Sequence, residues 1–98
     1  MKKFYIYILK CSDASYYVGH TDNLELRIGK HQAGEIEGYT HSRRPVGLVF
    51  SETFVSRIDA LERERQVKGW TRQKREALIR GDWNTIHNLS RGKDSKSI

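Results

Sequence analysis

The sequence has few cysteines and no long apolar segment, and each of these absences excludes a class of protein. Cys11 is the only cysteine among 98 residues, so the chain forms no internal disulfide and has no cysteine-rich metal site. No apolar run approaches the length of about 20 residues that a membrane-spanning helix requires. The short apolar stretch after Lys3 lacks a small-residue cleavage site, so it does not resemble a signal peptide. These features favour a cytoplasmic protein that does not cross a membrane.

The composition is typical of one small folded domain with an excess of positive charge. Hydrophobic residues make up 37% of the chain and charged residues 31%, a balance that does not favour disorder. The formal net charge is +6, and a basic surface attracts polyanions, of which nucleic acid is the commonest in a cytoplasm. Solubility alone is the simpler explanation of this charge, so nucleic-acid binding needs support from particular residues.

The apolar pattern predicts an α+β fold, a small three-stranded antiparallel sheet flanked by helices in the order β-β-α-β-α-α. The strands are expected at residues 4–9, 16–19 and 46–54. The helices are expected from a cap at Thr21 or Asp22 to about Gln32, from Ser56 to about Lys68, and from Thr71 to about Arg80. One more short helix is expected over residues 82–89. We expect a single domain over residues 1–89 and a flexible basic tail over residues 90–98.

Three polar residues fall on helix faces that are otherwise apolar. At 100° per residue, Arg27 and His31 share one narrow arc with the apolar residues of the first helix, and Glu64 lies in the middle of the apolar arc of the second. A charge on such a face is costly unless it is paired or faces a cleft. Arg27 and Glu64 could form a structural ion pair beside a hydrogen-bonded His31. Alternatively, all three line a functional site.

An ordered set of motifs resembles one known family. Tyr5-Ile6-Tyr7, then Tyr17-Val18-Gly19, then the inward Arg27, His31 and Glu64 resemble the GIY-YIG nuclease domain, in particular its short stand-alone bacterial members. Thr40, Arg44-Pro45 and Val67-Lys68 match the loop and helix motifs of those members. The resemblance covers residues 4–80, and it departs from the family name at Tyr5, where a glycine is usual.

The resemblance implies metal-assisted hydrolysis of phosphodiester bonds in DNA. Glu64 would hold one divalent ion, Mg²⁺ or Mn²⁺, which stabilises the leaving oxygen. Tyr7 would activate or position the attacking water, with support from Tyr17. Arg27 would clamp the scissile phosphate, and His31 would assist proton transfer or hold a tyrosine hydroxyl. Two further residues would have structural roles at the site, Tyr5 and Gly19, the latter by letting the backbone bend.

Several basic residues are expected to contact the nucleic acid, and they lie in loops and on the later helices. They are Lys10, Arg43, Arg44, Lys68, Arg72 and Lys74. Trp70 could stack on an exposed base, although a core position at a helix junction is the more common role for such a residue. Many family nucleases also use a late asparagine, for which Asn84 and Asn88 are the candidates.

Three functions are compatible with the sequence. The first is an endonuclease acting on structured, damaged or single-stranded DNA in repair or processing, with RNA as an alternative substrate. The second is a nucleic-acid-binding module of the same fold with weak or no catalysis, which the absence of a separate recognition domain favours. A protein partner would then supply substrate specificity. The third, a protein–protein adaptor, has least support because the sequence shows no clear apolar docking patch. Replacing Glu64 separates the first two, because only an enzyme would lose cleavage and keep binding.

Overall fold

The structure is a computed structural model that describes residues 2–96, with side chains described up to residue 90. The chain divides into two compact units with a boundary between Lys68 and Gly69. The first unit contains, in order, β1 (Phe4–Lys10), β2 (Tyr16–Thr21), α1 (Leu24–Ala33), a short 3₁₀ helix (His41–Arg43), β3 (Gly47–Phe54) and α2 (Arg57–Lys68). The second contains α3 (Arg72–Arg80) and α4 (Trp83–Lys96). Among the described residues, no helix is both long and apolar enough to cross a bilayer.

The sheet of the first unit confirms the predicted fold class. Its three strands run antiparallel in the order β2-β1-β3, with β1 in the centre. In this register Tyr7 lies opposite Gly19 on one side and opposite Ser51 on the other. The register between β1 and β3 shifts between Ile8 and Leu9. The strong alternation of bulky residues in the sequence was therefore sufficient to predict β1 and its hairpin partner.

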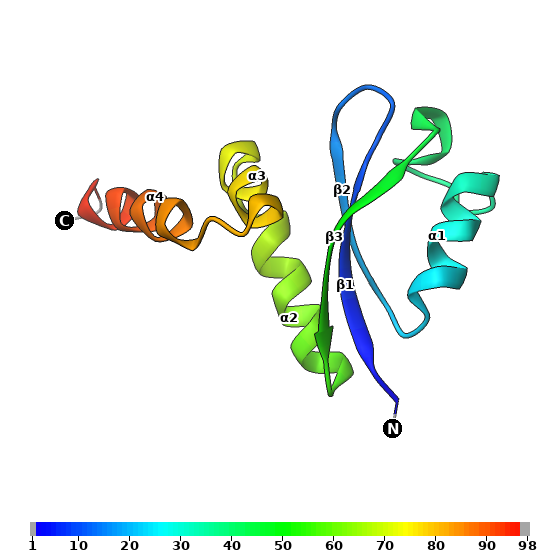
Figure 1. Cartoon of the computed structure of the whole chain (residues 1–98), viewed down its shortest axis with the longest axis horizontal. Helices are drawn as coiled ribbons and strands as arrows, with labels where there is room; N and C mark the ends of the chain where they lie inside the picture. The colour runs from blue at the N-terminus through cyan, green and yellow to red at the C-terminus, as the bar shows by residue number, and fades with distance from the viewer. Residues whose placement is uncertain (1, 97–98) are drawn as a thin grey trace. The chain divides into compact units, whose positions relative to one another are not determined.

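Two helices cover opposite faces of this sheet, as Figure 1 shows. Tyr7 and Leu9 pack with Leu24 and Ile28 on the α1 face. Because side chains alternate along a strand, the fully buried Ile6 and Ile8 face α2 instead. Burial on both faces explains why β1 is almost continuously apolar.

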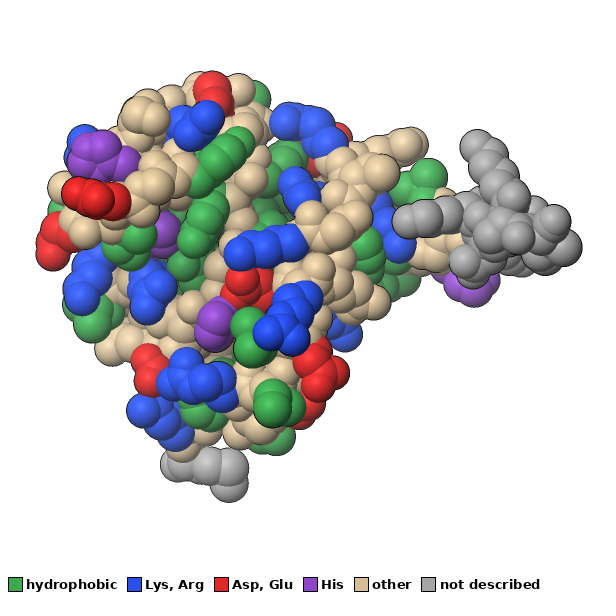
Figure 2. Space-filling model, turned by 180° about the vertical axis from the view of Figure 1, so that it is seen from behind, with side chains coloured by type: hydrophobic (Ala, Val, Ile, Leu, Met, Phe, Trp, Pro, Cys, Tyr) green, Lys and Arg blue, Asp and Glu red, His purple; other side chains and the backbone are tan. Residues whose placement is uncertain are grey.

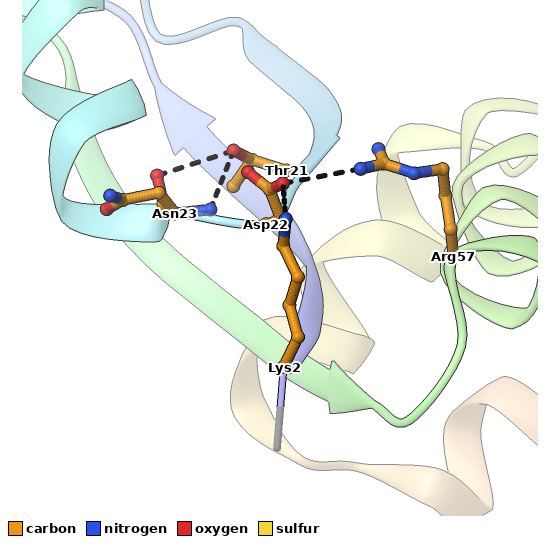
Figure 3. Close-up of polar contacts among 5 residues, drawn as sticks. All are labelled: Lys2, Thr21, Asp22, Asn23 and Arg57. Carbon is orange, nitrogen blue, oxygen red and sulfur yellow. Dashed lines mark hydrogen bonds and ion pairs between the residues drawn. The ribbon is translucent and has the colours of Figure 1, made fainter.

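The turn between β2 and α1 corrects one prediction. The cap of α1 is Asn23, whose side chain accepts a hydrogen bond from the backbone N–H of Leu26, and not Thr21 or Asp22. Figure 3 shows what those two residues do instead. The Thr21 hydroxyl bonds the backbone of Asn23. The Asp22 carboxylate pairs with Lys2 at 3.0 Å and with Arg57 at 3.3 Å. Asp22 thus ties the start of β1 and the start of α2 to this turn.

The second unit is a helix pair, of which α3 has the ends that the sequence predicted. Thr71 caps α3 by accepting a hydrogen bond from the Lys74 N–H, and Gly81 ends it with a positive φ of 72°. The following helix is longer than expected, since α4 continues to Lys96 through most of the predicted tail. Residues 97 and 98 of that tail lie outside the described residues. The proposal of one domain over residues 1–89 stays a prediction, and the boundary in the structure lies at residue 68.

Candidate active site

The side chain of Tyr7 crosses its neighbouring strand at a position that has no side chain. Gly19 lies opposite Tyr7, and a Cβ added at Gly19 would be 2.5 Å from the Tyr7 hydroxyl oxygen and 2.6 Å from Cζ. Real Cβ atoms do not approach other atoms so closely. The sequence predicted that Gly19 lets the backbone bend, but Gly19 continues β2 as a regular strand. Its role is to give the Tyr7 hydroxyl room to reach α1.

On α1 the Tyr7 hydroxyl meets His31, the only buried residue of that helix. The Tyr7 oxygen is 3.0 Å from His31 Nε2, and His31 Nδ1 is 2.7 Å from Thr40 Oγ1. Tyr7, His31 and Thr40 are 0%, 1% and 2% exposed. We call these three residues the buried relay. Thr40 was not predicted as a site residue, because it lies in a loop where no periodicity indicates which side chains turn inward.

The surroundings of the buried relay favour neutral groups. Burial raises the pKa of the Tyr7 hydroxyl, and the nearby Tyr17 adds to this effect. Burial also lowers the pKa of His31, assisted by the positive charge of Arg27. Both groups are therefore uncharged near pH 7, and the contact between them is a hydrogen bond between neutral partners.

Arg27 and Tyr17 complete this side of the site. Arg27 is half-buried on α1, as its helical phase predicted, and its positive charge acts on the Tyr7 hydroxyl, where it opposes the effect of burial on the pKa. The half-buried Tyr17 ring lies 6.3 Å from the Tyr7 ring and 5.2 Å from the His31 ring, measured between centroids. It also stacks on Tyr39 at 6.2 Å. The predicted residues Tyr7, Tyr17, Arg27 and His31 are thus brought together.

Glu64 lies on α2 and is 7% exposed, which agrees with its predicted inward face. The sequence allowed a structural ion pair between Glu64 and Arg27, but the partners of Glu64 in the structure are two other residues. Oε1 contacts Nδ1 of His20, and Oε2 lies 2.6 Å from the ammonium of Lys68. Burial opposes ionisation of Glu64, but the hydrogen bonds from Lys68 and His20 outweigh it, so its pKa lies below the usual range. We call Glu64, His20 and Lys68 the charged cluster.

His20 was not predicted as a site residue, and its contact with Glu64 was missed. The alternation of side chains along β2 indicates which face of the sheet His20 occupies. Val18 is 3% exposed and faces α2, so His20, two residues later, must face the same helix. The charged cluster also lies within electrostatic reach of the buried relay, since Glu64 contributes to the raised pKa of Tyr7.

A divalent ion fits the chemistry of Glu64. Its buried carboxylate already binds a cation, the Lys68 ammonium, on Oε2. Among residues whose side chains are described, no three His, Cys, Asp or Glu side chains gather to form a full metal cage. A lone carboxylate, supplemented by water and a substrate phosphate, suits Mg²⁺ or Mn²⁺.

The predicted contacts to nucleic acid are mostly engaged within the protein. Arg43 pairs with Asp13 at 3.1 Å and lies 3.9 Å from the centroid of the Tyr39 ring. Arg44 donates to the carbonyl of His41 at 3.0 Å. These two arginines therefore fix the loop that carries Tyr39 and Thr40. Figure 2 shows Lys and Arg side chains at many points of one face of the molecule, with fewer acidic side chains among them.

The remaining basic predictions belong to different environments. Lys10 is exposed at the end of β1, and Lys68 is part of the charged cluster. In the second unit Arg72 pairs with Glu76 at 3.2 Å, and the Lys74 ammonium lies 4.5 Å from the centroid of the Trp70 ring.

The other predicted residues are less directly connected to the site. Tyr5 is half-buried on β1, on the same strand face as Tyr7 and opposite Thr21. This position agrees with a structural role. Asn84 and Asn88 are exposed on α4 in the second unit.

The sequence is similar to those of known proteins. Residues 3–77 match the family described as the GIY-YIG catalytic domain. A UPF0213 protein of Staphylococcus haemolyticus is 47% identical over 79 residues, which cover 81% of this chain and 96% of the relative. A UPF0213 protein of Natronomonas pharaonis is 44% identical over 75 residues, covering 76% of this chain and 88% of the relative.

Two solved structures are also similar. The NMR structure of a UPF0213 protein from Bacillus halodurans is 40% identical with a TM-score of 0.53, covering 79% of this chain and 82% of that one. The NMR structure of a protein from E. faecalis is 32% identical with a TM-score of 0.58, covering 83% and 86%.

Proposed function

The chain belongs to the GIY-YIG family of nuclease domains, and we propose that it is a divalent-metal-dependent endonuclease that hydrolyses phosphodiester bonds in DNA. Its substrate is structured, damaged or single-stranded DNA in repair or processing. The observation that carries this proposal is the convergence of Arg27 and His31 on the hydroxyl of Tyr7, with Glu64 within electrostatic reach. A structural ion pair would not require this arrangement.

Arg27 is assigned to the scissile phosphate. Its guanidinium has five donors in a planar fork, which suits two oxygens of a phosphate. Its charge already acts on the Tyr7 hydroxyl at the site. Because Arg27 is half-buried, a phosphate bound there would be partly withdrawn from water, which strengthens the interaction.

The two tyrosines differ in exposure, and this difference supports separate roles. Tyr17 is partly exposed and Tyr7 is fully buried. We assign contact with the substrate and the attacking water to Tyr17, whereas the sequence favoured Tyr7 for this role. Tyr7 then acts from the buried side of the site, where its hydroxyl is hydrogen-bonded to His31 and takes part in removing the proton of the water.

Glu64 is assigned to the metal. The bound ion would supply charge stabilisation for the leaving oxygen of the phosphodiester. Glu64 is ready for this role because its lowered pKa keeps it ionised. Lys68 must move away from Oε2 for an ion to bind there, and as a half-exposed side chain it is able to do so.

A nucleic-acid-binding module with weak or no catalysis is the second candidate. It is favoured by one observation, that both Glu64 oxygens already have protein partners. In that case a protein partner would supply the specificity or the missing activity.

Cleavage of a labelled panel tests the proposal. The panel contains duplex, single-stranded, flap and branched DNA together with one RNA, with Mg²⁺ or Mn²⁺, and compares the native chain with Glu64→Ala and Arg27→Ala. We expect cleavage that falls by at least about 100-fold in both variants, since each removes an interaction made in the transition state. Glu62→Ala, an exposed carboxylate on the same helix, should cleave normally.

The outcomes separate the two candidates. Salt-sensitive binding that survives Glu64→Ala while cleavage is lost supports the enzyme. Folded native protein that binds DNA and cuts none of the substrates contradicts the enzyme and supports the binding module.

A further inference from the structure

Thr40 stands apart from the predicted site, yet it is almost fully buried and its hydroxyl is 2.7 Å from His31 Nδ1. A neutral imidazole has one donor nitrogen and one acceptor nitrogen, and the bond made by one nitrogen fixes the state of the other. The contact at Nδ1 is therefore coupled to what His31 does at Tyr7, and because a hydroxyl can donate or accept, the Tyr7 side must decide the direction.

The hydrogen bonds around Tyr7 determine which nitrogen carries the proton. The positive charge of Arg27 acts on the Tyr7 hydroxyl. A cation attracts the oxygen lone pairs and repels the hydroxyl proton, so the Tyr7 proton is directed away from Arg27. Tyr7 is fully buried, and its own proton needs an acceptor inside the protein. The hydrogen-bond partner of the Tyr7 hydroxyl is His31, which can accept through Nε2 at 3.0 Å. Nε2 is then unprotonated, and the proton of the neutral ring lies on Nδ1.

We propose that Thr40 is a positioning residue whose hydroxyl accepts the Nδ1 proton of His31 and so holds Nε2 ready to receive the proton of Tyr7. An isolated imidazole prefers its proton on Nε2, so the protein must impose the other tautomer. Thr40 does this because its hydroxyl can accept a hydrogen bond at a position where a buried N–H would otherwise be unpaired.

The tautomer of His31 determines the direction in which a proton can move. With Nε2 open, the Tyr7 proton passes to His31 as the Tyr7 oxygen takes up a proton from the site. The imidazolium that forms carries one proton on each nitrogen, and its Nδ1–H remains hydrogen-bonded to the Thr40 hydroxyl. With the opposite tautomer, Nε2–H would donate to Tyr7 and no proton could move inward. The effect on rate rests on the proposed nuclease function, whereas the tautomer does not.

Nitrogen NMR of the imidazole rings tests the tautomer without any cleavage assay. Signals of His31 are assigned by their loss in His31→Gln, and the other three histidines, His20, His41 and His87, serve as internal references. We expect a protonated Nδ1 and an unprotonated Nε2 in the native chain near neutral pH. Thr40→Val, which keeps the shape and removes the hydroxyl, should shift the proton toward Nε2, and Thr40→Ser should restore the native spectrum.

Cleavage supplies a second measurement. Thr40→Val should lower kcat by about 10-fold with little change in KM, because a proton-transfer step is weakened and substrate contacts are not. Thr40→Ser should recover most of the rate. Thr53→Val, an exposed threonine of β3, is the matched control and should leave both values unchanged.

Each outcome either supports or overturns the role proposed for Thr40. A native spectrum with the proton on Nε2 overturns the inference, even if Thr40→Val does not fold. An unchanged His31 spectrum in folded Thr40→Val also overturns it. If the native chain cuts nothing while the tautomer is as expected and depends on Thr40, the positioning role stands and the proposed nuclease function fails.

Discussion

The two halves of the site differ in their charge and in their exposure to solvent. The buried relay of Tyr7, His31 and Thr40 consists of neutral groups joined by hydrogen bonds and closed to solvent. The charged cluster around Glu64 contains an ion pair with the half-exposed Lys68 and a hydrogen bond with His20. Buried polar groups must be satisfied before any ligand arrives, so the relay is preformed by folding. The charged cluster keeps a partner that a ligand can replace.

β2 connects these halves because its side chains alternate between the two faces of the sheet. Tyr17 faces the buried relay, and His20 faces the charged cluster. Gly19 lies between them and leaves the space through which Tyr7 reaches His31. A short strand segment therefore contributes to both halves, and a change at Gly19 should affect the relay most.

Gly19→Ala should produce the largest effect on stability. The new Cβ would overlap the buried hydroxyl end of Tyr7, which can move only by breaking its contact with His31. Overpacking of this kind costs about 1–3 kcal/mol. We expect the free energy of unfolding in urea to fall by that amount, and cleavage to fall with it.

Gly29→Ala is the matched control. Gly29 lies inside α1, and a Cβ there would meet nothing within 4 Å. Alanine is a better helix former than glycine by about 1 kcal/mol, so this variant should be more stable than the native chain. If both variants changed stability in the same direction, the space at Gly19 would not be the cause.

Much of this fold was predictable because the sheet and the helix ends depend on local sequence. Alternation in β1, the helix starts at Ser56 and Thr71, and the end of α3 near Arg80 were all predicted correctly. The inward faces of Arg27 and Glu64 followed from helical phase alone. Whether they paired with each other did not, since pairing depends on tertiary distance.

The parts that were missed depend on contacts between distant segments. Thr40 reaches His31 from a loop, and loops carry no periodic signal. Arg43 was assigned to nucleic acid from its charge, whereas in the structure it holds Tyr39 and Asp13. Charge in a sequence shows that a cation is present and does not show whether a partner in the same chain already holds it.

The pH dependence of stability distinguishes the two halves. The pKa of His31 in the folded chain lies below its ordinary value of 6.5 because of burial and Arg27. As pH falls through about 6.5, the unfolded chain binds a proton at His31 before the folded chain does, so stability decreases with falling pH. The groups facing this ring are Arg27, Tyr7 and Tyr17. Glu64, whose folded pKa is lowered from 4.5, should reduce stability only at lower pH.

Urea unfolding of the native chain and of His31→Gln at about pH 7.5 and about pH 5.5 measures this effect. We expect the native chain to lose stability relative to His31→Gln as the pH falls, because the variant has no proton to gain at that position. A difference that stays constant across this range would mean that His31 titrates equally in both states, which would contradict its enclosed position.

Lys68→Met should give the smallest effect and addresses the charged cluster alone. The ammonium lies 2.6 Å from Glu64 Oε2, one helical turn away, and is 50% exposed. Pairs of this kind contribute about 0.3–0.5 kcal/mol, so its removal should tighten Mn²⁺ binding by about twofold, measured by titration calorimetry. Arg65→Met removes the same charge from an exposed position of α2 and controls for net charge. Weaker binding in Lys68→Met would mean that Lys68 helps to hold the ion, and the charged cluster would then be as preformed as the buried relay.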